Sequence, residues 1–155
     1  MNSEFLRRAI ELASDNVRKG LGGPFGAVIV RDGKIVAEAA NSVTSSCDPT
    51  AHAEVNAIRA AARKLGTFSL KGCALYTSCE PCPMCLASAY WARVDAIHYG
   101  AGAEDAARAG FDDAFFYRQL ALPPAERSIP AQQSLAEEAR ESFALWMKSL
   151  QRVEY

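Results

Sequence analysis

Four side chains suited to metal binding and proton transfer occur in two short segments of the chain. His52 and Glu54 are two residues apart in the first segment, and Cys82 and Cys85 are three apart in the second. Imidazole nitrogen and thiolate sulfur are ligands that zinc prefers, and a catalytic zinc site keeps one of its four tetrahedral positions for water. His52, Cys82 and Cys85 would supply the three protein ligands. Glu54 could then take a proton from water and return it to a reacting group.

The first pair is expected in the opening turn of a helix. Asp48-Pro49-Thr50 is a helix-start signal and Gly66 is a stop signal, so a helix is predicted from about Ala51 to Leu65. In the middle of a helix, side chains two residues apart point to nearly opposite faces. His52 and Glu54 can therefore act together only if they lie where the helix begins.

The second pair lies at the start of another predicted helix, PCPMCLASAYWA, which Pro83 opens. Side chains three apart share a helix face, so Cys82 and Cys85 can reach one point. The positive end of the helix also favours their thiolates.

The remaining elements are expected to form a mixed sheet with helices. Apolar periodicity predicts an amphipathic helix over residues 2–19, and Asp32-Gly33 predicts a tight turn between strands at residues 25–30 and 34–40. The segments CALYT and DAIHYGA are predicted to be strands on either side of the helix PCPMCLASAYWA. This order of strand, helix and strand favours a parallel, right-handed crossover. Residues 104–120 show a short helical pattern without a clear assignment. The capping box Ser134-Leu135-Ala136-Glu137 predicts a final helix.

Length and composition favour one compact enzyme domain. The chain has 155 residues, of which 50% are hydrophobic, and 17 Lys and Arg balance 18 Asp and Glu at a sequence pI near 6.1. This balance argues against a nucleic-acid partner. No secretory signal or membrane span is expected, because acidic residues interrupt the N-terminal stretch and no apolar run approaches ~18 residues. A cytoplasmic location follows as an expectation, and five cysteines there point to metal or catalysis rather than to disulfides.

Other interpretations of the cysteines and histidines stay open. A redox dithiol would leave His52 and Glu54 unexplained. A structural zinc site would need a fourth ligand, for which Cys79 is the candidate. The remaining residues of these types are expected to be ordinary: Cys47 and Cys73 as partly buried side chains, and His98 as a core histidine.

His52-Ala53-Glu54 together with Pro81-Cys82-Pro83-Met84-Cys85 matches the H-x-E and P-C-x-x-C pattern of zinc deaminases that act on bases. Nearly the whole chain resembles the bacterial guanine deaminases of the cytidine deaminase superfamily, through GGPFGAVIV, NSVTSSCDPTAHAEVNAIR, LYTSCEPCPMCLASAYWARVDAIHYGA, AGFDD and the ending VEY. DPTAHAE and EPCPMC are shared with the tRNA adenosine deaminases. TSCEPCPMC as a whole, GFDD and the long tail with its aromatic end favour the guanine deaminases.

The resemblance implies a fold, an assembly and a reaction. The expected fold is α/β, with three α/β/α layers around a central mixed sheet of about five strands. Residues 1–155 would form a single zinc-dependent deaminase domain with a C-terminal helical arm over 131–155. The expected assembly is a homodimer with one Zn²⁺ per chain. The reaction would be hydrolysis of the C2 amine of guanine to give xanthine and ammonia, with Glu54 protonating the ring nitrogen and the leaving amine.

The resemblance also implies substrate contacts. Asn41 would hydrogen-bond the base, Phe25 would lie against the ring, and Asp113 would accept from guanine N–H groups. Ala53 and Tyr155 complete the expected set, with the arm that ends in Tyr155 closing an active site, that of the partner subunit in a swapped dimer. The residues alone leave other roles open: a turn residue for Asn41, core packing for Phe25, a helix cap for Asp113, and an arm packed on its own subunit.

Two rival functions remain at this point. A tRNA adenosine deaminase would grip an anticodon stem and would commonly show a basic surface. A non-enzymatic zinc-binding interaction module would have no need of Glu54. Within the enzyme class, guanosine, another aminopurine or an aminotriazine could replace guanine as the substrate, because pocket shape depends on loops that sequence does not place.

Overall fold

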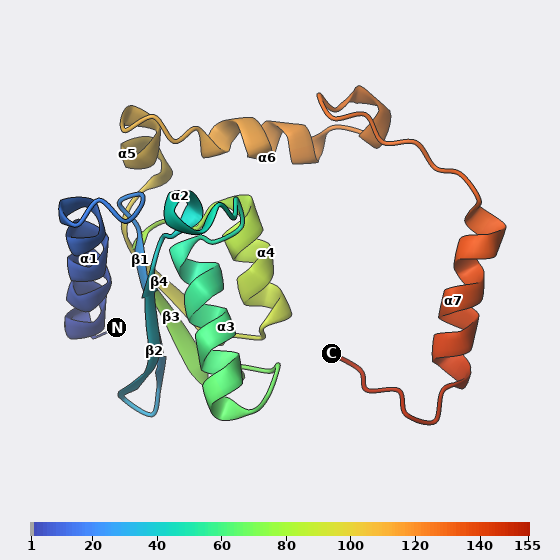
Figure 1. Ribbon diagram of the computed structural model, residues 1–155, viewed down its shortest axis with the longest axis horizontal. Coiled ribbons are helices and arrows are strands. Elements are labelled where there is room, and N and C mark those ends of the chain that lie inside the picture. The colour runs from blue at the N-terminus through green and yellow to red at the C-terminus, as the bar shows by residue number, and fades with distance from the viewer. Residues whose placement is uncertain (1) are drawn as a thin grey trace. The chain divides into compact units, whose positions relative to one another are not determined.

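The computed structural model describes residues 2–155, which divide into a first unit that ends at Asp113 and a second unit, Ala114–Tyr155. The first unit is built on a mixed sheet with the strand order β2-β1-β3-β4 (Figure 1). The strands are β1 (Gly26–Arg31), β2 (Lys34–Ala40), β3 (Cys73–Cys79) and β4 (Ala96–Ala101). β1 pairs antiparallel with both β2 and β3, whereas β3 pairs parallel with β4.

Two core clusters lie on opposite faces of this sheet because alternate residues of β1 point to opposite sides. Val28 and Val30 pack with Ala9 of helix α1 (Ser3–Arg18) on one face. Ala27 and Ile29 pack on the other face with buried alanines of α3 (Ala53–Leu65) and α4 (Pro83–Trp91). Figure 1 shows α1 on one side of the sheet and α3 and α4 on the other. The predicted three-layer α/β/α fold is therefore confirmed.

The predicted hairpin is confirmed in its turn as well as in its strands. Asp32 and Gly33 have φ values of 50° and 70°. Both angles are positive, as the two-residue hairpin turn requires, and glycine and aspartate tolerate them better than bulkier residues do.

The crossover from β3 through α4 to β4 is parallel, as the order of strand, helix and strand predicts. α3 begins and ends close to the predicted bounds, and Gly66 caps it with φ 66°. A short helix, α2 (Val43–Ser46), lies between β2 and α3 and was not expected.

The expectation of about five strands is wrong, because the sheet of residues 2–155 has four. The chain after β4 carries no alternating run of β-branched residues that could add a strand. It forms the helices α5 (Ala103–Arg108) and α6 (Asp113–Ala121) instead. The helical pattern of residues 104–120 thus resolves into two short helices.

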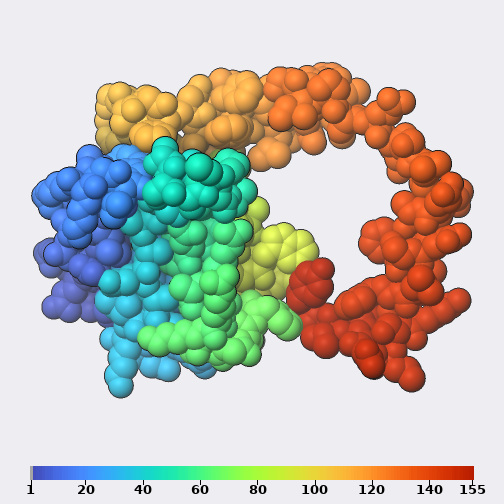
Figure 2. All heavy atoms as spheres, viewed as in Figure 1, coloured from blue at the N-terminus to red at the C-terminus, as the bar shows by residue number. Residues whose placement is uncertain are grey.

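The second unit contains most of α6, a 3-10 turn at Pro124–Glu126 and helix α7 (Ala136–Lys148). None of its side chains is buried, and its atoms are coloured orange to red in Figure 2. The predicted capping box is wrong. Leu135, with φ 53°, is the residue before the first turn, so α7 begins too late for the Ser134 side chain to cap it.

Within residues 2–155, no helix is long and apolar enough to span a membrane.

Candidate active site

The start of α3 brings His52 and Glu54 to the same cavity. His52 is the residue that precedes the helix, and its backbone is extended at φ −69° and ψ 154°. Glu54 is the second helical residue. Because the backbone changes direction between them, the opposite orientation that a regular helix imposes does not apply. The expectation of an opening turn is confirmed.

The start of α4 resembles the start of α3, because a metal-ligating residue with an extended backbone precedes each helix. Cys82 precedes the helix with φ −63° and ψ 167°, Pro83 is the first helical residue, and Cys85 is buried one turn on. Proline fits this position because the first N–H groups of a helix have no intrahelical acceptor. Both sulfurs lie at the positive end of the helix, which stabilises thiolates.

The two helix starts place three metal-ligating atoms together. Sγ of Cys82 and Sγ of Cys85 lie 3.6 Å and 3.4 Å from Nδ1 of His52. All three ligand atoms fall within 4.8 Å of one another. A tetrahedral zinc with Zn–S of about 2.3 Å and Zn–N of about 2.0–2.1 Å would separate sulfur and nitrogen by about 3.5 Å. The two sulfur–nitrogen separations therefore match those of a zinc site.

The protonation of the cluster also suits a metal. Hydrogen bonding from Cys85, with a further contribution from His52, lowers the pKa of the Cys82 thiol to about 4. The hydrogen bond between the two cysteines raises the pKa of the Cys85 thiol. The hydrogen bond between Cys82 and His52 raises the pKa of the His52 imidazole. The lowered pKa of Cys82 favours its thiolate, the form of the side chain that binds a metal ion.

Glu54 is held at the cavity wall by contacts to both of its carboxylate oxygens. Glu54 is 4% exposed. The hydroxyl of Thr77 donates to Oε1 at 3.2 Å, and the thiol of Cys85 donates to Oε2 at 3.4 Å. Burial raises the pKa of the Glu54 carboxyl, so this group accepts a proton more readily than an exposed glutamate does.

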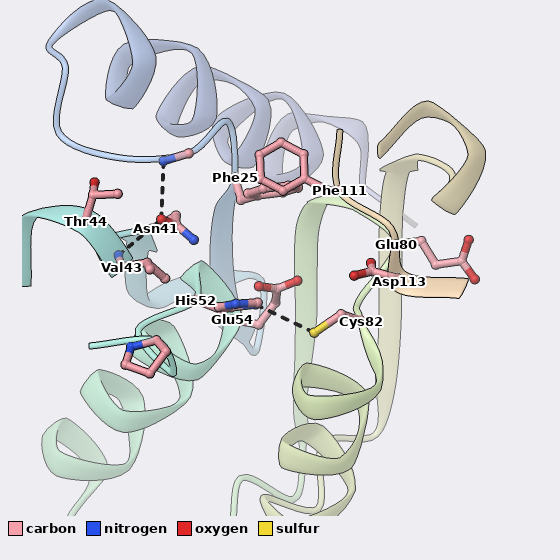
Figure 3. Close-up of a pocket in the computed structure, with 12 residues that line it drawn as sticks. Phe25, Asn41, Val43, Thr44, His52, Glu54, Glu80, Cys82, Phe111 and Asp113 are labelled. Carbon is pink, nitrogen blue, oxygen red and sulfur yellow. Dashed lines mark hydrogen bonds between the residues drawn. The ribbon is translucent and has the colours of Figure 1, made fainter. Parts of the chain in front are cut away.

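His52, Glu54 and Cys82 open onto one cavity of the first unit, with a volume of about 320 Å³ (Figure 3). Polar side chains and two aromatic rings line it, a composition typical of a site for a small ring-shaped ligand. The lining residues are Gly23, Phe25, Asn41, Val43, Thr44, Pro49, His52, Glu54, Glu80, Cys82, Phe111 and Asp113.

Three of the five residues expected to contact substrate line this cavity: Phe25, Asn41 and Asp113. Phe25 meets the ring of Phe111 edge to face at 4.8 Å between centroids. Asp113 lies near Cys82 and His52, and burial raises the pKa of its carboxyl.

The other two expected contacts are placed differently. Ala53 does not line the cavity with its side chain, which is fully buried in the core. Tyr155 belongs to the second unit.

Three residues in or next to the cavity were not among the expected site residues. Phe111 belongs to the AGFDD segment, but only the structure shows its ring against Phe25. Glu80 lies in the cysteine motif, and its Oε2 accepts from the N–H of Ala103 at 3.1 Å. Thr77 is recognisable only from the strand register that points it at Glu54.

The remaining cysteines and His98 are outside the ligand cluster. The Cys79 thiol contacts the carbonyl of Gly102 at 3.7 Å, so Cys79 does not complete a four-ligand site. Cys73 is buried, as expected, but the expectation of burial is wrong for Cys47, which is exposed in a left-handed turn after α2. His98 is half-buried and stacks on Tyr76 at 4.6 Å.

The family model for the cytidine and deoxycytidylate deaminase zinc-binding region matches residues 1–101. The chain belongs to this deaminase family. The matched region contains both helix starts and thus the whole His-Cys-Cys cluster with Glu54.

Among family members, the chain is 54% identical to a guanine deaminase of Bacillus subtilis (strain 168), over 100% of both chains. An X-ray structure of guanine deaminase from Bacillus subtilis superposes with a TM-score of 0.97, covering 100% of this chain and 99% of that one. A tRNA-specific adenosine deaminase of Aquifex aeolicus is 43% identical over 97 residues, which is 63% of this chain and 64% of that protein. The structure of a guanine deaminase from Nitrosomonas europaea, 32% identical, has a TM-score of 0.66 and covers 70% of this chain and 63% of that one.

Proposed function

We propose that this deaminase is a zinc-dependent hydrolase that converts guanine and water into xanthine and ammonia. The observation that carries the proposal is the placement of Glu54, buried between Thr77 and Cys85 yet open to the cavity beside three metal ligands. The substrate assignment is supported by similarity to a guanine deaminase over the full chain, whereas the similarity to a tRNA adenosine deaminase covers 63% of it.

His52, Cys82 and Cys85 would hold one zinc ion per chain, since their ligand atoms lie within 4.8 Å of one another and both sulfur–nitrogen separations suit zinc. When bound, zinc supplies Lewis-acid chemistry that makes water a competent nucleophile near neutral pH. The protein contributes the orientation of the three ligands and the buried base beside them.

Glu54 would manage the protons of the reaction. As a carboxylate it accepts a proton from the attacking water, whose oxygen forms a bond to C2 of the base. As a carboxylic acid it delivers this proton to the ring nitrogen next to C2. It then takes the remaining proton from the hydroxyl on C2 and passes it to the amine, which leaves as ammonia when the C2–N bond breaks and the C2 carbonyl forms. The raised pKa of Glu54 suits both roles, because a carboxyl must hold each proton between transfers.

Three cavity residues would recognise the ring. Phe25 and Phe111 form an aromatic wall, Asn41 offers hydrogen bonds to the edge of the base, and Asp113 accepts from its N–H groups. Ala53 would contact the ring only through its backbone, since its side chain is buried. An unpaired polar group in such a cavity penalises a base that lacks the matching atom.

The arm over residues 131–155 is proposed to close an active site of a homodimer, with Tyr155 contributing to the partner's cavity. The second unit supports this idea because it has no buried side chain. Its large apolar residues need a surface to cover them: Phe116, Leu120, Phe143, Leu145, Met147 and Leu150 are each at least half exposed. Exchange of an identical arm is a low-cost route to a dimer.

An ammonia-release assay on purified protein tests the proposal. Guanine, guanosine, adenine, adenosine, cytosine and an aminotriazine are compared at equal concentration, together with tRNA, and Glu54→Ala is the inactive control. A strong signal with guanine alone is expected. A signal only with tRNA or adenosine would replace guanine by the tRNA reaction, and no signal with any substrate would favour a zinc-binding module.

A further inference from the structure

The side-chain amide of Asn41 is fixed in one orientation by backbone groups. Its Oδ1 accepts hydrogen bonds from the N–H of Gly23 at 3.3 Å and from the N–H of Val43 at 3.2 Å. Figure 3 shows both bonds, with the Nδ2 group on the side of Asn41 that faces the cavity. In the opposite orientation Nδ2 would face two N–H donors, and both bonds would be lost.

A second asparagine holds this arrangement from outside the cavity. Asn16 lies near the end of α1 and is 5% exposed. Its Nδ2 group donates to the carbonyl of Gly23 at 2.8 Å and to the carbonyl of Asn41 at 2.8 Å. Asn16 thus joins the two backbone segments that fix the Asn41 amide.

The two segments are in close contact where Asn16 joins them. A Cβ atom on Gly22 would lie 2.4 Å from the carbonyl oxygen of Asn41 and 3.0 Å from Nδ2 of Asn16. No side chain fits there, so the loop lies directly against the end of β2. The N–H of Asn41 donates to the carbonyl of Phe25 at 3.0 Å, which ties the same strand end to β1.

We propose that Asn16 is a positioning residue that locks the Asn41 amide with its N–H donors toward the cavity, so that this edge of the pocket selects a ring bearing hydrogen-bond acceptors. This inference rests on the proposed deaminase function. Guanine presents a carbonyl oxygen and a ring nitrogen acceptor on its C6 side, whereas adenine presents an amino donor at C6. Two donors facing the amine of adenine would leave polar groups unpaired.

The test compares Asn16→Ala with Val28→Ala, a control that removes buried volume on the α1 side of the sheet without touching the loop. For Asn16→Ala, KM for guanine should rise roughly 10-fold while kcat falls much less, since the hydrogen bonds lost serve binding. Competitive inhibition by hypoxanthine should weaken relative to inhibition by adenine. Val28→Ala should lower the melting temperature and leave KM and this inhibition ratio unchanged.

Hydrogen exchange gives a readout that needs no activity. The backbone amides of Gly23 and Val43 should be protected in the wild-type protein and should exchange roughly 10-fold faster in Asn16→Ala. Asn16→Ser keeps one hydrogen-bond donor, so its exchange rates should fall between those of the wild-type protein and those of Asn16→Ala. The serine variant replaces the alanine variant in this test if the alanine variant does not fold. The inference would be overturned if either Asn16 variant had the same KM for guanine, the same ratio of hypoxanthine to adenine inhibition and the same amide protection as the wild-type protein. If the wild-type protein released no ammonia, the proposed function would be wrong. The hydrogen-exchange comparison would still test whether Asn16 positions the Asn41 amide.

Discussion

The hydroxyl of Thr77 donates a hydrogen bond of 3.2 Å to Oε1 of Glu54, and it does so from a fully buried position on β3. The catalytic candidate on α3 is therefore oriented by the central sheet as well as by its own helix. A hydrogen bond to an ionised group contributes about 1.5–3 kcal/mol, which is enough to hold a carboxylate in one rotamer.

Replacing Thr77 with Val should lower kcat for guanine by roughly 10-fold. The substitution keeps the shape of the side chain but removes the donor, so Glu54 loses the contact that orients its Oε1 oxygen. Steady-state kinetics measure the effect. Thr77→Ser, which keeps the hydroxyl, should retain most of the activity, and equal losses in both variants would point to a packing defect instead.

Glu54→Ala should lose nearly all turnover, by roughly 10²–10⁴-fold or more, because one group serves several proton transfers. Metal analysis and circular dichroism should show that zinc content and fold persist. Glu54→Gln, a neutral side chain of nearly the same shape, should be equally inactive. Near-normal turnover in either variant would rule out Glu54 as the base.

Cys82→Ala should lower zinc content well below one ion per chain, because only two of the three clustered ligands remain. Chelation of the wild-type protein should likewise abolish turnover and lower the melting temperature, since a ligand that binds only the folded state stabilises it. Cys79→Ser is the matched control and should keep its zinc, as Cys79 contacts Gly102 rather than the cluster. Full occupancy in the Cys82 variant would refute the ligand set.

Asp113→Ala should reduce guanine turnover much more than it reduces stability. Asp113 lines the cavity, where it would accept from the N–H groups of the base. Loss of such a contact costs discrimination between substrates rather than core packing. Parallel measurement of kcat/KM and melting temperature separates the two effects, and matched losses would support a helix cap as the role of Asp113.

Deletion of residues 153–155 should abolish most turnover while zinc content and melting temperature stay near those of the intact protein. The reason is that the proposed arm excludes bulk water from a cavity that is otherwise complete. Tyr155→Ala tests whether the aromatic ring alone is responsible. If the truncated enzyme keeps normal turnover, the arm does not close an active site.

The residues that converge at the helix starts could be predicted because their signals are local. Pro83 and Gly66 mark where helices begin and end, and the spacing of His52 from Glu54 makes sense only in an opening turn. The Asp32-Gly33 turn is local in the same sense. Such features depend on a few neighbouring residues, so the sequence specifies them directly.

The supporting residues could not be predicted because their partners are distant in the chain. Thr77 reaches Glu54 only through the packing of α3 on the sheet, and Asn16 reaches Asn41 only because α1 covers the end of β2. The reverse holds at Ser134, where a local sequence pattern predicted a helix cap that the structure lacks. Leu135 adopts a left-handed backbone there, and α7 begins after it. Register and packing decide these cases, and neither is encoded in a short motif.

The candidate metal site is shared between two helices, and this division has a consequence for how the enzyme could change over generations. α3 and α4 lie on the same face of the sheet (Figure 1), and the core beneath them includes Ala57, Ala61, Ala89 and Ala92. A bulkier residue at one of these alanines would shift one helix relative to the other by a fraction of an ångström. Such a shift would alter the separation of His52 from the cysteines while every cavity residue stayed the same. Selection for a different metal ion or a different working temperature could therefore act through alanines that never meet the substrate.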